Sequence, residues 1–327
     1  MNSDLIVFSG TSHPGLTESI CRHLGRPMER SETVKFANDN LMVRVLDNCR
    51  EKDVFIVQTS TAPVNESLVE LLIFIDAVKY ASASRITVVL PYYPYARSDK
   101  KDEPRISVTA RLVSDLLVTA GADRILTMNL HSPQIQGFFR KPADQLLAAP
   151  EFFRYFDEVL FRQEPREDFV LVMGDTGAAK AFSYYSDELD LPMAIIDKFR
   201  SDHTDRPTIR QIVGDVKGKS CLLVDDEIAT AGTLVKAAAK LMEFGARRVL
   251  ATAVHPVLCG DAVQRIIDSP IEKVIIGNTV PVHNKIGAHP DRFSVLDLSG
   301  LFAKAIQCIH NGDSMSGLFP PSIRRTN

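Results

Sequence analysis

Two adjacent carboxylates stand directly before a run of small residues in the second half of the chain. Asp225 and Asp226 follow the apolar residues 220–224, and residues 229–233 lead into a helical pattern. Backbone N–H groups and hydroxyls at the start of a helix bind phosphate groups, and paired carboxylates bind sugar hydroxyls or hydrated Mg2+. This stretch, here called the small-residue loop (residues 224–233), therefore predicts a sugar-phosphate site. The alternative is an ordinary solvated turn that leads into a tightly packed helix.

A second stretch combines proline, tyrosine and alternating charge. Residues 91–105, here called the lid, read PYYPYARSDKKDEPR. Cations and aspartates alternate along it: Arg97, Asp99, Lys100, Lys101, Asp102 and Arg105. When such a loop closes, its cations can neutralise a polyphosphate and its aspartates can balance bound Mg2+. The lid therefore predicts a mobile polyphosphate-binding loop, and the alternative is a solvated charged loop without a ligand.

Short apolar runs alternate with helical patterns along the whole chain. This rhythm predicts an α/β fold in which parallel sheets are covered by helices. The expected strands are residues 5–8, 54–58, 86–90, 125–128, 170–173, 194–197, 221–224, 249–253 and 274–276. The expected helices with the clearest spacing are residues 67–80, 108–120, 233–244 and 298–310. Because the small-residue loop follows the strand at 221–224, we expect it at the carboxyl end of a sheet, where open α/β sheets hold ligands.

The same α/β unit occurs twice in the chain. Residues 121–126 followed by His131 match residues 245–250 followed by His255 at the same spacing, and such self-similarity indicates a duplicated fold. The first copy has about ten additional residues after its first strand; they belong to the lid, and long loops at such positions are usually functional. We expect a first domain at 1–147 with the lid, a second at 148–310 with the small-residue loop, and a tail at 311–327.

Composition excludes several classes of protein. The chain has 327 residues, of which 45% are apolar and 24% charged, as in a globular protein of about two domains. A net charge of -3 provides no basic field for nucleic acid or for an anionic membrane. The 5 cysteines are widely spaced, which argues against a disulfide framework and a zinc site. No basic leader or membrane-spanning apolar run is found, so we expect a cytoplasmic enzyme.

Two motifs resemble those of known families. Residues 224–233, VDDEIATAGT, resemble the phosphoribosyl-pyrophosphate loop of the type I phosphoribosyltransferase superfamily. The lid and residues 130–139, LHSPQIQGFF, resemble the ribose-phosphate pyrophosphokinase family, and the similarity runs nearly end to end. The resemblance implies two tandem phosphoribosyltransferase-like domains, each a mostly parallel sheet flanked by helices. It also implies Mg2+-dependent transfer of the β,γ-diphosphoryl group of ATP to the anomeric hydroxyl of ribose 5-phosphate, which gives 5-phosphoribosyl 1-pyrophosphate and AMP.

The resemblance also implies roles for individual residues. Those that would act on the transferring phosphates are Lys198, Arg200, Arg97, Lys100 and His131. ATP would contact Phe36, Asn38 and Asn40, partly across a subunit boundary, and Arg97, Ser98, Asp99, Lys100 and His131. Ribose 5-phosphate would contact Asp225, Asp226, Ala229, Thr230, Ala231, Gly232 and Thr233. His131 and Asp175 would hold Mg2+, and a regulatory phosphate would contact Arg50, Ser82, Arg105, Ser314 and Ser316.

An ATP site shared between subunits implies a homo-oligomer, a dimer or a hexamer, without nucleic-acid or membrane partners. The chain departs from the family's usual residues at Asn40, Asn48, Ser98, Gln145 and Ala229. Two other functions stay open: a phosphoribosyltransferase, and a catalytically silent regulatory paralogue. The tandem copies and the lid favour the synthetase over the transferase, and the retained cations and acids favour an active enzyme. As alternatives for single residues, Lys198 and Arg200 could be surface cations, His131 structural and Phe36 a core residue.

Overall fold

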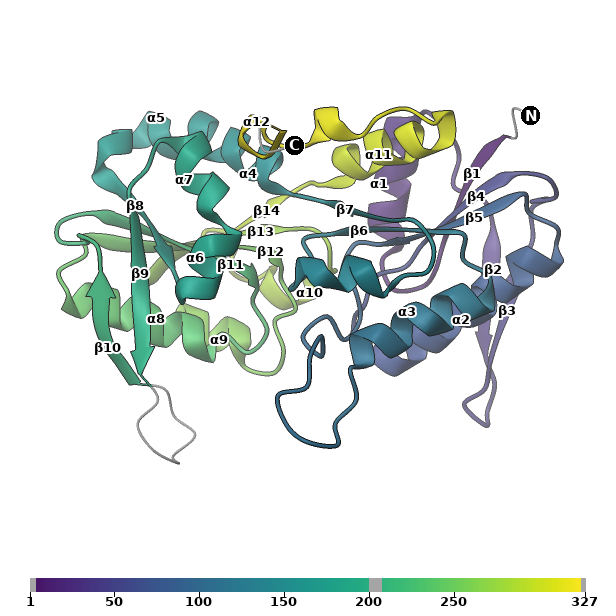
Figure 1. Cartoon of the computed structure of the whole chain (residues 1–327), viewed down its shortest axis with the longest axis horizontal. Coiled ribbons are helices and arrows are strands. Elements are labelled where there is room, and N and C mark those ends of the chain that lie inside the picture. The colour runs from purple at the N-terminus through teal and green to yellow at the C-terminus, as the bar shows by residue number, and fades with distance from the viewer. Residues whose placement is uncertain (1–3, 200–207, 325–327) are drawn as a thin grey trace. The chain divides into compact units, whose positions relative to one another are not determined.

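The computed structural model describes residues 4–199 and 208–324 (Figure 1). By their contacts, these residues form two compact units. The first comprises the chain up to Ala148 together with Thr279–Pro281 and Leu298–Leu318. The second comprises the described part of Ala149–Asn278, Val282–Asp297 and the residues from Phe319. The last long helix of the chain therefore packs with the first unit.

The first unit is built on a sheet in which all neighbouring strands are parallel. In spatial order its strands are β1 (Leu5–Ser9), β4 (Asp53–Val57), β5 (Arg85–Leu90), β6 (Arg124–Met128) and β7 (Ala143–Leu146). The central strands are aliphatic and almost wholly buried, as strands covered on both faces must be. One face carries α2 (Val64–Tyr80) and α3 (Thr109–Ala120), and the other carries α1 (Pro14–Leu24) and α11 (Ser299–Asn311) (Figure 1).

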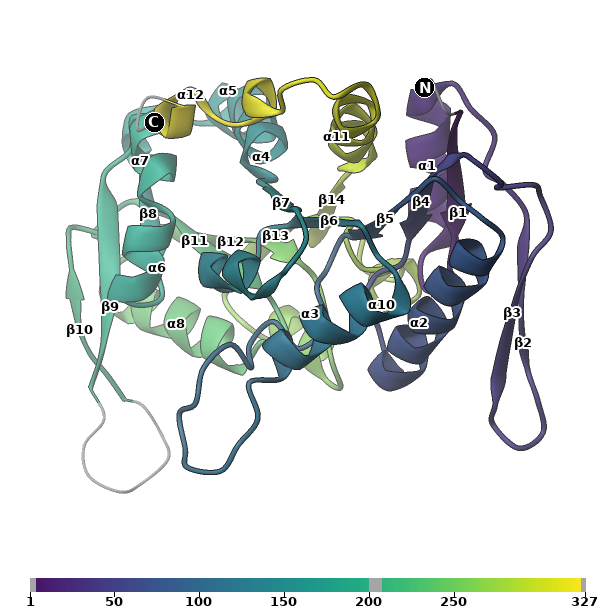
Figure 2. The same cartoon turned by 45° about the vertical axis from the view of Figure 1, so that its right-hand side comes forward.

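An antiparallel hairpin, β2 (Ser31–Lys35) and β3 (Leu41–Val45), projects from the first unit beside α2 (Figure 2). Its strands are short and mostly half-exposed, with Val43 buried in the core and Val45 packed against it. The sequence has no apolar run at β2, which is why the hairpin was not expected.

The second unit contains a larger sheet, of which only β10 is antiparallel to its neighbour. In spatial order its strands are β10 (Thr208–Val213), β9 (Met193–Phe199), β8 (Phe169–Met173), β11 (Ser220–Glu227), β12 (Arg248–His255), β13 (Ile271–Gly277) and β14 (Phe293–Leu296). One face is covered by α8 (Gly232–Glu243), α9 (Ala262–Ile267) and α10 (His283–Ile286). The remaining helices of this unit are α4 (Ala149–Tyr155), α5 (Phe161–Gln163), α6 (Thr176–Ala181), α7 (Ser183–Leu189) and α12 (Pro321–Arg324).

The expected α/β class and its main elements are confirmed. The expected strands correspond to β1, β4, β5, β6, β8, β9, β11, β12 and β13, and the expected helices to α2, α3, α8 and α11. The strands that were not expected are β2, β3, β7, β10 and β14. Apart from the hairpin, these lie at sheet edges, where half-exposed positions dilute the apolar signal.

The internal repeat is also confirmed, because β5–α3–β6 and β11–α8–β12 have the same order and the same parallel pairing. Each helix ends at a glycine with positive φ, 128° at Gly121 and 87° at Gly245, where a residue with a side chain would be strained. In both copies the next N–H closes the helix end, with Ala122 N donating to Leu117 O at 3.0 Å and Ala246 N donating to Leu241 O at 3.0 Å.

Candidate active site

Three neighbouring strands of the second unit, in the order β9, β8 and β11, run parallel and end at one edge of the sheet. Asp175 follows β8, Lys198 is the penultimate residue of β9, and Asp225 and Asp226 lie near the end of β11. Acids from two strands and a lysine position thus come to the edge where open α/β sheets bind ligands. The side chain of Lys198 and the whole of Arg200 lie outside the described residues.

Asp175 is the N-cap of the short helix α6. Its Oδ1 accepts a hydrogen bond from Ala178 N at 2.8 Å, which satisfies one of the unpaired N–H groups at the helix start. The residue is exposed, so its second carboxylate oxygen is accessible to a ligand. The structure therefore gives Asp175 a local capping role and leaves an oxygen that a hard cation can use.

The Asp225 and Asp226 carboxyls form an electrostatically strained pair. Burial of the Asp225 carboxyl is the main cause that raises its pKa from 3.8 to about 8, and a hydrogen bond with Asp226 and the charge of Asp226 add to the rise. Asp225 Oδ1 also accepts from Asp226 N at 2.9 Å, which favours the ionised form without cancelling the other effects. Two carboxylates this close cannot both be ionised without a compensating charge or donor. A sugar hydroxyl or a cation supplies such a partner.

The small-residue loop presents a concave row of amides. Ala231 has left-handed backbone angles, φ 59° and ψ 0°, directly before α8 begins at Gly232. Within residues 4–199 and 208–324, no hydrogen bond is made by the N–H groups of Ala229, Thr230 or Ala231. Such a left-handed step before a helix turns successive N–H groups toward one point and makes an anion-binding concavity. The geometry of these three amides suits a phosphate group, and the assignment of the loop to a sugar phosphate stays a prediction.

In the first unit, Ser98 ties the two ends of the lid together. Its hydroxyl donates to Ser107 O at 3.2 Å and accepts from Thr109 N at 3.2 Å. Ala110 N donates to the carbonyl oxygen of Ser98 at 3.1 Å. Because Thr109 is the first residue of α3, Ser98 satisfies an N–H group at the start of that helix. The segment between the tied ends, residues 99–106, comprises the rest of the lid and Ile106 and is here called the lid tip.

The cationic side chains of the lid are accessible to a ligand. Arg97, Lys100 and Arg105 are exposed. Lys100 Nζ lies 3.8 Å from Asp102 Oδ1, but both side chains are exposed, and such pairs contribute at most about 1 kcal/mol. A polyphosphate can therefore displace the aspartate at little cost in free energy.

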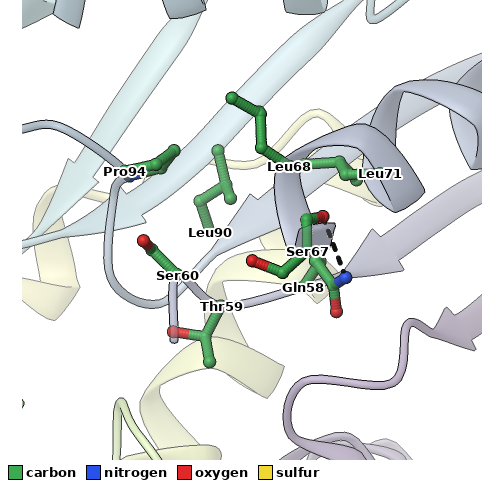
Figure 3. A pocket seen from close by; sticks show the side chains of 8 residues that line it. All are labelled: Gln58, Thr59, Ser60, Ser67, Leu68, Leu71, Leu90 and Pro94. Atoms are coloured by element: carbon green, nitrogen blue, oxygen red, sulfur yellow. Dashed lines mark hydrogen bonds between the residues drawn. The ribbon is translucent and has the colours of Figure 1, made fainter. Parts of the chain in front are cut away.

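A small pocket lies beneath the start of the lid (Figure 3). Its lining residues are Gln58, Thr59, Ser60, Ser67, Leu68, Leu71, Leu90 and Pro94. Gln58 Nε2 donates to Ser67 O at 3.1 Å and to the buried Glu70 Oε2 at 2.8 Å, so the polar groups there are used internally. With a volume of about 10 Å³, the pocket is far smaller than ordinary ligand sites. The hydrogen bonds of Gln58 hold the chain just after β4, and the pocket is too small for a nucleotide.

His131 follows β6 and is exposed at the carboxyl edge of the first unit's sheet. Its loop is held by Asn129, a buried residue that the sequence analysis missed. Asn129 has φ 39°, its N–H donates to Leu146 O at 2.9 Å, and its Oδ1 accepts from Ala148 N at 2.8 Å. Asparagine is one of the few residues that adopts left-handed angles readily. An asparagine directly after an apolar strand was the sequence feature that could have indicated this left-handed turn.

The residues expected at the adenine lie in the hairpin tip between β2 and β3 (Figure 2). Phe36 N donates to Asn40 O at 2.8 Å, and Asn40 N donates to Asn38 Oδ1 at 3.3 Å. Phe36 is 47% exposed, which excludes the alternative that it is a core residue of this unit. An open groove of about 860 Å³ beside the tip is lined by Lys35, Asp39, Asn40, Leu41, Asn65, Glu66, Val69 and Ile73. The tip therefore offers an aromatic face and amides to a ligand or a partner.

Four residues expected to hold a regulatory phosphate lie at the amino edge of the first unit's sheet: Arg50, Ser82, Ser314 and Ser316. The loops before β4 and β5 are joined by a hydrogen bond from Glu51 N to Ser82 O at 2.8 Å. The end of α11 docks on the same edge, because His310 Nδ1 and the buried Asp53 Oδ2 are 2.7 Å apart.

Arg105, the fifth residue of that set, belongs to the opposite edge. It lies two residues before Ser107, which Ser98 holds near the start of α3. β5 has 6 residues and therefore spans about 20 Å between the two edges. Within one chain, Arg105 is separated from the other four residues by the length of that strand.

Comparisons with known proteins agree along the whole chain. Family models describe the N-terminal domain of ribose phosphate pyrophosphokinase at residues 5–121 and a phosphoribosyl synthetase-associated domain at residues 200–320. The ribose-phosphate pyrophosphokinases of Deinococcus radiodurans and Caldanaerobacter subterraneus subsp. tengcongensis are 47% and 44% identical, over 97% of this chain and 98% of theirs. The crystal structure of phosphoribosylpyrophosphate synthetase from Mycobacterium smegmatis matches with a TM-score of 0.88 at 39% identity, over 95% of this chain and 100% of that chain. The chain therefore belongs to the ribose-phosphate pyrophosphokinase family.

Proposed function

We propose that this protein transfers the β,γ-diphosphoryl group of ATP to the anomeric hydroxyl of ribose 5-phosphate, giving 5-phosphoribosyl 1-pyrophosphate and AMP. The observation that carries the proposal is the duplicated β–loop–α–β unit, in which one copy bears a cationic lid and the other an acidic pair with an amide row. Relatives of the same length that bear the pyrophosphokinase name support it. A single-domain phosphoribosyltransferase would have no use for the second copy with its lid.

Ribose 5-phosphate binds at the end of β11. The free amides of Ala229, Thr230 and Ala231, with the hydroxyls of Thr230 and Thr233, hold the 5-phosphate, and Gly232 opens the helix behind it. The Asp225 and Asp226 carboxylates accept hydrogen bonds from the ribose hydroxyls. Hydrogen bonds to a charged acceptor are roughly twice as strong as neutral ones, so this pair fixes the sugar's orientation.

ATP binds against cations from two places in the chain. Arg97, Asp99 and Lys100 of the lid, with Ser98 and His131, meet its phosphates, and Phe36, Asn38 and Asn40 of a neighbouring subunit meet the adenine. Lys198 and Arg200 stabilise the charge that develops on the transferring group. Phosphoryl transfer of this kind depends on positioning and charge neutralisation rather than on a covalent enzyme intermediate.

The residues present at the carboxyl edge fit Mg2+. Asp175 offers an exposed carboxylate, and Asp225 and Asp226 bring two further carboxyls to the same edge. Oxygen ligands of this type suit Mg2+, which usually keeps few protein ligands and binds through substrate phosphates. In the described ranges, no group of three His, Cys, Asp or Glu side chains is placed to hold a metal ion. When bound with His131 and Asp175, Mg2+ would neutralise charge on the ATP phosphates.

The reaction is a direct displacement. The anomeric oxygen of the sugar forms a bond to the β-phosphorus of ATP, and the bond from that phosphorus to the oxygen bridging the α-phosphate breaks. AMP leaves with the electron pair of the broken bond, and the proton of the hydroxyl passes to water. The protein's part is to align the two substrates and to neutralise the developing charge, which requires the nucleophile and the β-phosphorus to be held about 3 Å apart.

Product analysis tests the proposed function. The purified protein is incubated with ATP, Mg2+ and ribose 5-phosphate, and the nucleotides are separated by chromatography. We expect AMP and 5-phosphoribosyl 1-pyrophosphate in equal amounts. ADP with a ribose bisphosphate would show transfer of the γ-phosphoryl group and contradict the proposal, and absence of turnover would favour a silent regulatory paralogue.

The enzyme is proposed to act as a homo-oligomer in the cytoplasm. Val69 and Tyr80 on α2 and Leu112 and Leu116 on α3 are exposed apolar residues that a subunit interface would cover. The cysteines are free thiols, as expected in a reducing compartment. No helix in the described ranges is both long and apolar enough to cross a membrane.

Inorganic phosphate is expected to activate the enzyme, with Arg105 of one subunit completing the site formed by Arg50, Ser82, Ser314 and Ser316 of another. The separation of Arg105 from the other four residues within one chain is the physical reason for sharing the site between copies. Steady-state rates across a phosphate series at fixed ionic strength should rise severalfold in the wild type and in Arg162→Ala, a control at an exposed arginine of α5. Arg105→Ala should not respond. Equal activation of Arg105→Ala and the wild type would show that Arg105 does not belong to the phosphate site.

A further inference from the structure

The small-residue loop is held from behind by another part of the second unit. Leu258 N donates to Ile228 O at 2.9 Å, and Cys259 N donates to Ala229 O at 2.8 Å. Arg265 Nη1, from α9, donates to Thr230 O at 3.0 Å. Three successive carbonyls of the loop therefore accept hydrogen bonds from one neighbouring region, residues 257–265.

This arrangement determines where the loop's amides point. In a trans peptide, the C=O and the following N–H point in opposite directions. Because the carbonyls of residues 228, 229 and 230 face residues 257–265, the N–H groups of Ala229, Thr230 and Ala231 face the other way. These are the N–H groups that make no hydrogen bond to any described residue. The amides that would receive a phosphate therefore lie on the opposite side of the loop from the carbonyls that residues 257–265 hold.

The supporting region is itself fixed. Lys285 Nζ, from α10, donates to Val257 O at 2.6 Å, which anchors the segment that carries Leu258 and Cys259. Leu258 is buried and has φ 47°, and Gly260 has φ 54°. These left-handed steps bend the segment so that its N–H groups meet the loop's carbonyls instead of continuing β12. Left-handed angles are ordinary for Gly260 but sparsely populated for Leu258, so Leu258 keeps them only because its surroundings enforce them.

Arg265 stands out because its contact is not the one that an exposed arginine usually makes. In the described parts of the chain it forms no salt bridge, although Asp261 and Asp268 lie on or beside the same short helix. The Asp268 carboxylate is instead held by Gln264 Nε2 at 2.8 Å. The Arg265 guanidinium is therefore free to hold the Thr230 carbonyl, the last one before the left-handed step at Ala231.

We propose that residues 257–259 and Arg265 form a brace that orients the loop's amides toward the 5-phosphate of the sugar, and that Arg265 is a positioning residue for ribose 5-phosphate. It acts through the Thr230–Ala231 peptide and does not touch the substrate. This inference rests on the proposed function, because it assigns the phosphate of that substrate to this row of amides. The alternative is that these hydrogen bonds only stabilise the packing of the two loops and do not affect substrate binding.

The test compares Arg265→Ala, Arg265→Lys and the matched control Arg162→Ala, which removes an exposed arginine from α5 of the same unit. Ribose 5-phosphate binding is measured by calorimetry, and kcat and KM by the AMP assay. Since one hydrogen bond is at stake, we expect Arg265→Ala to raise the Kd and KM for ribose 5-phosphate about fivefold, with kcat and the KM for ATP nearly unchanged. Arg265→Lys, which still donates to a carbonyl, should recover most of the affinity, and Arg162→Ala should match the wild type.

A second readout needs no substrate. The amides of Leu258 and Cys259 donate to the loop, so their hydrogen exchange reports how firmly the brace holds it. We expect faster exchange at both amides in Arg265→Ala alone. Unchanged affinity, or a fall in kcat without a change in affinity, would overturn the positioning role, and unchanged exchange would overturn the brace. A wild type that binds no ribose 5-phosphate would overturn the proposed function, while the exchange data would still decide whether the brace exists.

Discussion

Replacing Lys198 by alanine is expected to lower kcat about a hundredfold while raising KM far less. The loss corresponds to about 3 kcal/mol, which is typical when one group that stabilises transition-state charge is removed. The reason is its place: Lys198 is next to the last residue of β9, and β9 pairs in parallel with β8, whose neighbour β11 carries the acidic pair. In the proposed reaction, a cation at this edge would stabilise the charge that develops as the β-phosphorus is attacked. Single-turnover and steady-state rates with saturating ATP and sugar measure the effect.

Lys217→Ala is the matched control for this change. Lys217 is an exposed lysine in the turn before β11, at the opposite edge of the same sheet. The same charge is removed from the same unit, so both variants share any general electrostatic effect. Equal rates in the two variants would show that Lys198 is an ordinary surface cation.

Asp225→Asn is expected to weaken ribose 5-phosphate binding by tenfold or more at pH 9, and by much less at pH 7. The carboxylate is the better acceptor for the sugar hydroxyls, and a hydrogen bond to a charged group is worth about 1.5–3 kcal/mol. In the free protein, however, the pKa of Asp225 is raised to about 8, so the carboxyl is mostly protonated at pH 7. Wild-type affinity should therefore rise with pH through about 8, whereas the affinity of the variant should stay flat.

Calorimetric titrations at pH 7, 8 and 9 decide this prediction. Above pH 7 the sugar phosphate is itself fully ionised, so its own titration adds no trend. A ratio of affinities that does not change with pH would mean that Asp225 binds the sugar in one protonation state throughout, or that it serves only the metal.

The same substitution should stabilise the fold at alkaline pH. A carboxyl whose pKa is raised on folding holds its proton longer in the folded state, so stability present at low pH is lost as the pH rises from about 4 to about 8. Asparagine has no such titration. We therefore expect the Tm of Asp225→Asn to exceed that of the wild type by a few degrees at pH 8.5 and to match it near pH 4. A Tm difference that does not grow with pH would show that ionisation of Asp225 does not destabilise the folded state.

The sequence predicted those parts of the fold in which a single local signal is strong. β4, β8 and β12 are continuous apolar runs because both of their faces are covered, and such runs are visible without any knowledge of their neighbours. β2 and β10 could not be found this way. Each pairs with a single strand and is partly exposed to solvent, so neither needs a continuous apolar run. The placement of α11 against the first unit is likewise a long-range fact, made by contacts such as His310 with Asp53.

The candidate site shows the same limit. Motifs identified Asp175, Asp225 and the small-residue loop, because the residue types that bind phosphates and sugars are few and local. The tie made by Ser98 and the contact of Arg265 with Thr230 were not predictable, since each depends on a partner that folding brings near. The raised pKa of Asp225 also depends on burial by surrounding elements, which no spacing rule reports.

The tie at Ser98 also affects how much chain entropy substrate binding must remove. Fixing the backbone of one residue costs about 1–2 kcal/mol, so a lid that had to order all of residues 91–105 at each turnover would use most of the binding energy of ATP for that alone. Ser98 already holds the residues on both sides of the lid tip through Ser107, Thr109 and Ala110. The closure proposed for the lid would then have to order residues 99–106 and not the whole lid, which lowers its entropy cost.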